Sequence, residues 1–188
     1  MTKEQYDKSI ETGELQLTLT NKFNHYSIVA WLCFPSIFLL LLHLYKKIIG
    51  DPAYFADGEI EIIVCTSVLA LLFYWLQKSR LKFKKLSINF PAKELMSYLQ
   101  ELCKEWDWTI AYHDNHTVIA KTNVSFFSGS WGEQVTVLFT QNLVLVNSIC
   151  DLDKKSSLVS MGHNRENVKA VTDLIANINT STNNKASI

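Results

Sequence analysis

Two long runs of apolar residues dominate the N-terminal half of the chain. Residues 27–45 contain no Asp, Glu, Lys or Arg. As an α-helix this stretch would be about 28 Å long, close to the thickness of the hydrocarbon core of a bilayer. Residues 60–77 form a second run, which is uncharged from Ile62 to Gln77. The pattern predicts two transmembrane helices rather than core helices, because a core helix of this length normally keeps a polar side.

A cleaved signal peptide is another structure that an early apolar run can indicate. Such a peptide begins with a short basic segment and ends at a cleavage site of small residues. Here the stretch before the first run is mostly polar and contains four acidic residues, and no A-x-A-like site follows the run. We therefore expect an uncleaved polar N-terminal tail, residues 1–26, followed by a transmembrane hairpin, residues 27–77.

The topology follows from the link between the two runs and from the basic residues around them. The link, residues 46–59, is short, so the helices should pack antiparallel with both chain ends on one side. Basic residues near the spans collect on the cytoplasmic side. Eight Lys or Arg lie outside the hairpin near its ends, against two in the link. This asymmetry predicts an integral, two-pass membrane protein with cytoplasmic N- and C-termini, most simply in a bacterial inner membrane.

The juxtamembrane segment, residues 78–85, holds five of these basic residues and no acidic residue. Basic side chains next to a bilayer are attracted to anionic lipids, so this segment is expected to lie near the lipid headgroups. A role in fixing the membrane topology would by itself also explain these five basic residues. The lipid-proximal residues are Lys78, Arg80, Lys82, Lys84 and Lys85.

Small residues predict where the two helices touch, because association in lipid depends on close approach rather than on hydrophobicity. Such residues recur at helical spacing on both runs. Those expected at the contact are Ala30, Cys33, Ser36, Thr66, Ser67 and Ala70. His43 is ionisable and lies inside a span, which makes it a functional candidate. Its closeness to Lys46 equally fits a neutral histidine at the membrane interface.

The pattern changes at Leu86, and residues 86–178 predict a soluble α+β domain. Residues 86–90 alternate between apolar and polar, which is typical of a strand with one buried face. Residues 91–106 place their apolar side chains on one helical face. Further alternating segments predict strands at 108–112, 117–121, 133–140 and 143–148.

The remaining elements give the order β-α-β-β-β-β-(β)-α. A short extra strand is possible at 157–161, and Asn164 suits the N-cap of a last amphipathic helix. Residues 179–188 are polar and predict a flexible tail. Short turns favour antiparallel strands, and two helices can cover one face of the sheet, so a two-layer domain is expected. The other face would be solvated or would cover something, and it would carry Thr109, Ala111, Gln134, Thr136 and Leu138.

Candidate chemistry in this domain is sparse. His113 and His116 flank a predicted turn, where their rings need not converge, and His163 is the only further histidine of the domain. A zinc site needs three or four ligands, so this pattern disfavours a metal centre. Asp151 and Asp153 could act as paired carboxylates, although two lysines follow them directly. No cofactor is expected.

Charge and cysteine spacing exclude further classes of function. Residues 86–188 carry eight Lys or Arg and ten Asp or Glu, a net charge of −2, which argues against a nucleic-acid partner. The four cysteines lack the spacing of a zinc motif or a disulfide framework and suit a reducing compartment. In the loop between the predicted strands 117–121 and 133–140, the aromatic residues are expected either to pack on the domain or to enter the membrane. They are Phe126, Phe127 and Trp131.

These observations predict a membrane-tethered interaction or regulatory module, such as an accessory or immunity-type subunit. Its partners would be membrane lipids and either another protein or a second copy of the chain. The alternative is a membrane-bound enzyme or ligand sensor with its site in the soluble domain. That alternative requires a pocket in which the histidines and aspartates converge.

Overall fold

The computed structural model describes residues 1–51, 55–123, 131–154, 160 and 162–186. It divides into two compact units. One comprises residues 22–79, and the other combines residues 1–21 with residues 80–188. We call them the hairpin unit and the soluble unit. The second is assembled from both ends of the chain, so the segments that precede and follow the hairpin fold together.

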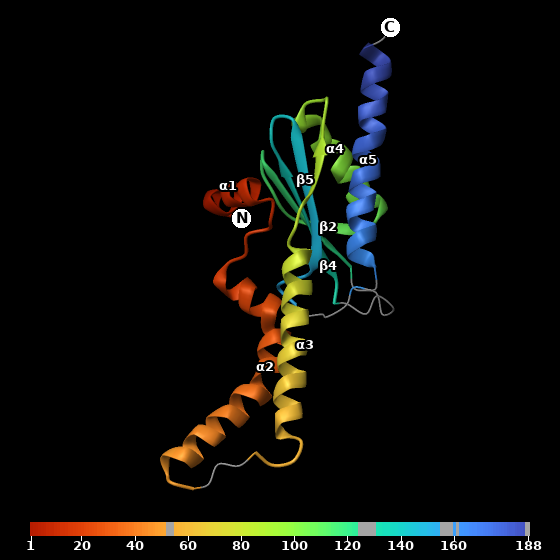
Figure 1. Cartoon of the computed structure of the whole chain (residues 1–188). Helices are drawn as coiled ribbons and strands as arrows, with labels where there is room; N and C mark the ends of the chain where they lie inside the picture. Colours follow the sequence, from red (N-terminus) through yellow and green to blue (C-terminus); the bar gives the residue numbers. More distant parts are fainter. Residues whose placement is uncertain (52–54, 124–130, 155–159, 161, 187–188) are drawn as a thin grey trace. The chain divides into compact units, whose positions relative to one another are not determined.

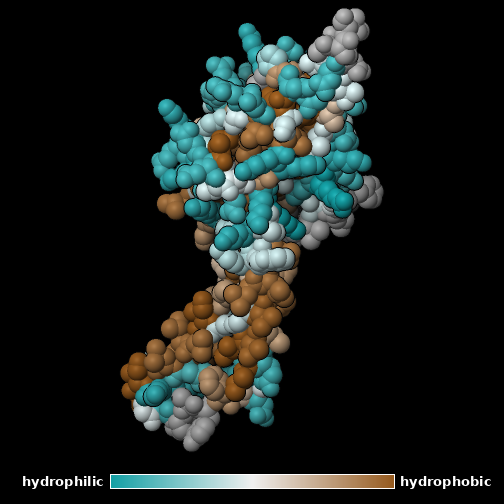
Figure 2. All heavy atoms as spheres, turned by 45° about the horizontal axis from the view of Figure 1, so that its top comes forward, coloured by the Kyte–Doolittle hydropathy of each residue, from teal (hydrophilic) through white to brown (hydrophobic). Residues whose placement is uncertain are grey.

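The hairpin unit consists of α2 (Leu19–Ile48) and α3 (Glu59–Arg80), both longer than the predicted spans. Both helices are long and apolar enough to cross a membrane, and only 11% and 6% of their most apolar stretches is buried within the protein. A helix in the core of a soluble protein would be mostly buried, so the low burial of α2 and α3 argues against their interpretation as core helices. In Figure 2 the surface of the two helices is mostly hydrophobic.

The soluble unit confirms the α+β prediction with an antiparallel sheet. The strands are β1 (Lys84–Ser87), β2 (Trp108–His113), β3 (Thr117–Thr122), β4 (Glu133–Phe139) and β5 (Leu143–Cys150). Their order across the sheet is β1-β5-β4-β3-β2, and every neighbouring pair is antiparallel. The possible strand at 157–161 lies outside the described residues.

Two helices, α4 (Ala92–Glu105) and α5 (His163–Ala186), cover one face of this sheet (Figure 1). Their apolar stripes pack on alternate residues of the strands, including Val135, Val137 and Val146. Trp106 was expected in the buried stripe of α4 but caps the helix and is 42% exposed. The alternation predicted for β2 also fails past Ile110, because a β-bulge shifts the register there.

The N-terminal segment, residues 1–18, is not a tail. Residues 3–12 form α1 (Lys3–Thr12), which lies on the opposite side of the sheet from α4 and α5 (Figure 1). Thr2 and Gln5 form a capping box at its start, and Gly13 ends it in the left-handed conformation. These signals are present in the sequence, but α1 has too few apolar residues for periodicity to reveal it.

A second apolar layer lies on the face of the sheet opposite α4 and α5, which the sequence predicts to be solvated or to cover something. Leu138, Leu145 and Ile149 point away from α4 and α5 and are fully buried. Among the described residues, five buried residues outside the main core can cover these three side chains. They come from both ends of the hairpin and from the loop after β5. They are Leu15, Leu17, Leu81, Phe83 and Leu152. The soluble unit therefore has more than the two predicted layers.

The juxtamembrane segment contributes to this second layer. Leu81 and Phe83 are buried in the soluble unit. The backbone N–H of Leu15 donates to the carbonyl of Leu81 (2.8 Å), and the N–H of Phe83 donates to the carbonyl of Gly13 (2.9 Å). Glu14 and Lys82 are thus paired in an antiparallel bridge. The two chain ends of the hairpin are joined by strand-like pairing.

Asn147 reinforces this junction from the centre of the sheet. Its side-chain amide donates to the carbonyls of Arg80 (2.8 Å) and Lys82 (2.9 Å), and the residue is 2% exposed. Asn147→Ala should lower the free energy of unfolding by about 2 kcal/mol, because it leaves two carbonyls near the core without these donors. Chemical unfolding of the detergent-solubilised chain measures this. A loss no larger than that of Asn142→Ala, an exposed turn residue, would contradict the role.

The last helix also extends past its predicted end. Residues 179–186 are helical rather than a flexible tail, since α5 continues to Ala186. Asn89 fixes this part of the helix: its backbone N–H donates to Asn179 Oδ1 (3.1 Å), and its side-chain amide donates to Asn183 Oδ1 (2.6 Å). Such long-range polar contacts leave no periodic signal in the sequence.

Candidate functional site

The two histidines of the β2–β3 turn do not converge. His113 lies beside α4, whereas the ring of His116 lies 5.6 Å from the ring of Tyr6 in α1. His163 is in the first turn of α5, where its Nδ1 lies 3.2 Å from Glu166 Oε2. Within the described part of the chain, no group of three or more His, Cys, Asp or Glu could hold a metal ion.

Asp114 organises the turn between the two histidines. One carboxylate oxygen accepts a hydrogen bond from the backbone N–H of His116 (2.7 Å), and the other accepts one from the Tyr112 hydroxyl (2.6 Å). Burial alone would raise the pKa of Asp114, but these hydrogen bonds outweigh it and hold the pKa below its ordinary value. Asp114 is therefore engaged in a structural turn.

Asp151 and Asp153 converge on Lys121 of β3. The Lys121 ammonium lies 2.9 Å from Asp151 Oδ1 and also donates to Asp153. The Asp151 side chain is 1% exposed, and its second oxygen lies 3.9 Å from Lys154. Burial alone would lower the pKa of Lys121, but the two aspartates outweigh it and raise the pKa. This cluster is charge-compensated, as expected of a structural ion pair.

The backbone beside this cluster is tightly packed at Gly132. Gly132 has φ +107°, and a Cβ there would lie 2.9 Å from the backbone carbonyl oxygen of Thr122. Gly132→Ala should therefore destabilise the chain by about 2 to 3 kcal/mol, from the left-handed backbone and the clash together. Gly162→Ala is the matched control, because Gly162 has φ +98° but a Cβ there would meet no atom of the described residues within 4 Å. Equal losses of thermal stability in the two variants would refute the packing argument.

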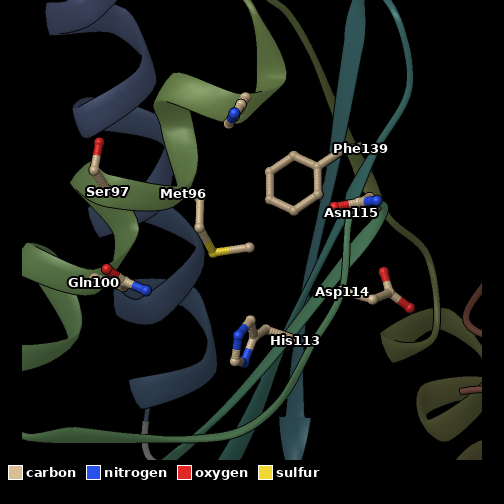
Figure 3. Close-up of a pocket in the computed structure, with 8 residues that line it drawn as sticks. Met96, Ser97, Gln100, His113, Asp114, Asn115 and Phe139 are labelled. Carbon is tan, nitrogen blue, oxygen red and sulfur yellow. The ribbon is translucent and has the colours of Figure 1, made fainter.

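A groove lies at the end of the sheet that carries the β2–β3 turn (Figure 3). Its volume is about 830 Å³, within the range of ligand pockets. Met96 and Phe139 supply apolar walls, and the Met96 thioether points into the groove (Figure 3). We call it the distal groove, and its lining residues are Lys93, Met96, Ser97, Gln100, His113, Asp114, Asn115 and Phe139.

Sequence reasoning selected His113 but missed the rest of this groove. Lys93, Ser97 and Gln100 lie on the exposed side of α4, which the amphipathic pattern marks only as a solvent-facing surface. Met96 belongs to the apolar stripe of the same helix, which the pattern marks as core. The walls come together because α4 packs beside β2. Of the five candidate residues, His113 lines the groove, while His116, Asp151, Asp153 and His163 lie elsewhere.

In the hairpin unit, hydroxyl groups join the two helices. Ser36 Oγ lies 2.6 Å from Thr66 Oγ1 and 3.1 Å from Ser67 Oγ, and it donates to the carbonyl of Ile63 (3.1 Å). Ala70 is 4% exposed, whereas Cys33 is half-buried and Ala30 is exposed. The contact is thus centred on Ser36, where small side chains allow close approach.

His43 lies at the other end of the hairpin and is paired. Its Nε2 lies 2.9 Å from Glu59 Oε2, and its ring lies 3.8 Å from that of Phe55. Glu59 also accepts a hydrogen bond from the backbone N–H of Ala56. The pair closes the hairpin next to the link.

The basic residues of 78–85 are divided among three places in the fold. Lys78 and Arg80 are in the last turn of α3, Lys82 is in the bridge with Glu14, and Lys84 and Lys85 are exposed on β1.

The chain matches no protein-family model, no curated protein and no solved structure.

Proposed function

We propose that this chain is a membrane-tethered interaction or regulatory module, an accessory or immunity-type subunit at the cytoplasmic face of a bacterial inner membrane. In this proposal α2 and α3 both cross the bilayer and anchor the soluble unit. The observation that carries it is the assembly of the soluble unit from residues 1–21 and 80–188.

That assembly bears directly on the number of crossings. A folded unit cannot form from two segments on opposite sides of a bilayer. The bridge between Glu14 and Lys82 therefore favours an even number of crossings between these two residues. The exposed apolar surface of both helices supports two crossings, because lipid would cover that surface. The eight basic residues near the hairpin ends, against Lys46 and Lys47 near the link, favour the cytoplasmic side for the soluble unit.

The position of the distal groove supports a binding role. The chain leaves the soluble unit near the end of β5 that holds Cys150, since Asn147 binds the Arg80 carbonyl. The groove lies at the opposite end of the sheet, beside Phe139 and the β2–β3 turn. The eight residues of β5 span roughly 23 Å, so the groove lies about that far from the point at which the chain joins α3. The partly buried Met96 side chain in its wall suits contact with a partner's apolar side chain.

In vivo photocrosslinking would test the proposal. A photoreactive amino acid at Ser97, on the rim of the groove, should give a discrete crosslinked product in membranes of the native host. The same group at Lys169, exposed on α5, is the control. Met96→Asp should abolish the Ser97 product without changing membrane association. Recovery of only an uncrosslinked monomer, together with a monomer in gentle detergent, would contradict the proposal.

A ligand sensor is the second candidate, and the volume and polar rim of the groove favour it. The enzyme version loses support because His113, His116 and His163 lie apart from the Asp151–Asp153 pair, which is engaged with Lys121. A sensor would bind a small molecule without any partner protein. Native mass spectrometry of the gently purified chain would then detect a bound small molecule that Met96→Trp, which fills the groove, displaces.

A further inference from the structure

One end of the sheet is defined by a row of residues across four strands. Trp108 pairs with Thr122, Thr122 bonds to Glu133, and Glu133 pairs with Cys150. Arg80 lies close to Cys150: burial raises the pKa of the Cys150 thiol above its ordinary value, and the charge of Arg80 acts against that rise. This is the end of the soluble unit from which the chain passes into α3, and we call it the proximal end.

Two exposed tryptophans lie at the proximal end. Trp106 comes two residues before Trp108 and is 42% exposed, and Trp131 comes two residues before Glu133 and is 53% exposed. Exposed tryptophans that gather at one end of a domain are typical of a surface that binds a membrane or another molecule. They come from different loops, so their common location follows from the register of the sheet rather than from sequence proximity.

Cationic side chains accompany the tryptophans. Lys104 is in the last turn of α4, two residues before Trp106, and Lys154 is 40% exposed beside Gly132. Arg80 also lies at the proximal end. Tryptophan with Lys or Arg is the combination that proteins place at the membrane–water interface, where the indole ring has an apolar body and a polar N–H.

We propose that the proximal end of the soluble unit contacts the lipid headgroup layer through Trp106 and Trp131. This contact is additional to the hairpin and would fix the orientation of the soluble unit, with the distal groove pointing into solution. The proposal rests on the membrane anchoring proposed above. It commits to lipid because the chain enters an apolar hairpin at this same end, at Arg80.

Quenching of tryptophan fluorescence by brominated lipid tests the contact. The full chain has five tryptophans, so single-tryptophan variants are made by replacing the others with phenylalanine. They are reconstituted into phosphatidylcholine–phosphatidylglycerol vesicles with bromine on the acyl carbons nearest the headgroup. A variant that keeps only Trp131 should lose most of its emission relative to unbrominated vesicles, and the Trp106 variant should behave likewise.

Two controls separate the possible failures. A variant whose only tryptophan is Leu143→Trp, at the far end of the sheet, should keep its emission. A variant that retains only Trp31, inside α2, reports insertion of the hairpin. If Trp31 is quenched but Trp131 is not, the lipid contact is refuted while the anchoring stands. If Trp31 is not quenched, the anchoring itself fails and the contact fails with it.

The buried Trp108 is the one replacement that endangers folding. The same comparison is therefore repeated in the native background, where the emission of Trp131→Phe is subtracted from that of the unmodified chain. The difference spectrum should be quenched by brominated lipid. An unquenched difference would overturn the proposal regardless of how Trp108→Phe folds.

Discussion

Replacing Leu15 and Leu17 together by aspartate is expected to lower the free energy of unfolding of the soluble unit by about 4 to 6 kcal/mol. Both leucines precede the hairpin, and they are 5% and 8% exposed. Truncating a buried leucine typically costs 2 to 5 kcal/mol, and an aspartate in its place adds the cost of a desolvated charge. An N-terminal tail without tertiary contacts would tolerate the same change.

Chemical unfolding of the detergent-solubilised chain, followed by the emission of the buried Trp108, measures this loss. The control is the double variant Thr18→Asp and Thr20→Asp, which adds the same charge at two exposed positions close by. If the two double variants unfold at the same denaturant concentration, the N-terminal segment does not cover the second face of the sheet.

Lys121→Met is expected to cost about 3 to 5 kcal/mol, because it removes the closest countercharge of a buried carboxylate. The Asp151 side chain is 1% exposed, and its remaining cation, Lys154, is 3.9 Å away. Removing one partner of a buried ion pair costs more stability than replacing both partners by apolar residues, because the remaining charge stays buried without its countercharge. A double variant with Asp151→Leu should therefore recover part of the loss.

The pH dependence gives this prediction a second readout. The pKa of Lys121 is raised above its ordinary value of 10.5 in the folded chain. The stability that its ammonium contributes is fully present below that ordinary value and is lost as the pH rises through the raised pKa. The difference in the free energy of unfolding between the unmodified chain and Lys121→Met should be constant near neutral pH. It should decrease as the pH rises through the raised pKa of Lys121. Lys169→Met, at an exposed site, should show no such difference, and a pH-independent difference would count against the pairing.

Periodicity alone predicts much of this fold. Alternating Val135, Val137 and Phe139 define the inner face of β4, and the helical spacing of Leu95, Leu99 and Leu102 defines α4. Both signals arise because one side of each element is buried and the other is not. The same reasoning identifies two helices that are long and apolar enough to cross a membrane.

The covering of the second face was not predictable in this way. Leu15 and Leu17 alternate with polar residues, but two leucines are too few to indicate a strand. Leu81 and Phe83 stand between lysines and read as a lipid-facing segment. Their burial depends on the return of the chain through the hairpin, a contact between residues more than sixty positions apart. The distal groove was missed for a related reason, because outward-facing side chains carry no periodic mark of convergence.

An engineered disulfide between positions 14 and 82 tests the central claim, that both ends of the hairpin join one folded unit on one side of the membrane. Glu14 and Lys82 form a non-hydrogen-bonded antiparallel pair, in which Cα atoms are about 4.5 Å apart, within the disulfide range. Glu14→Cys with Lys82→Cys is expressed in native membranes and oxidised. Glu14→Cys with Lys169→Cys is the mispaired control.

Alkylation with a mass-tagged maleimide then counts free thiols in the monomer band. The account predicts that the 14–82 variant keeps only its four native thiols, whereas the mispaired control has both introduced thiols alkylated as well. Reduction should restore both thiols of the 14–82 variant. Alkylation of positions 14 and 82 to the same extent as in the control would contradict the account.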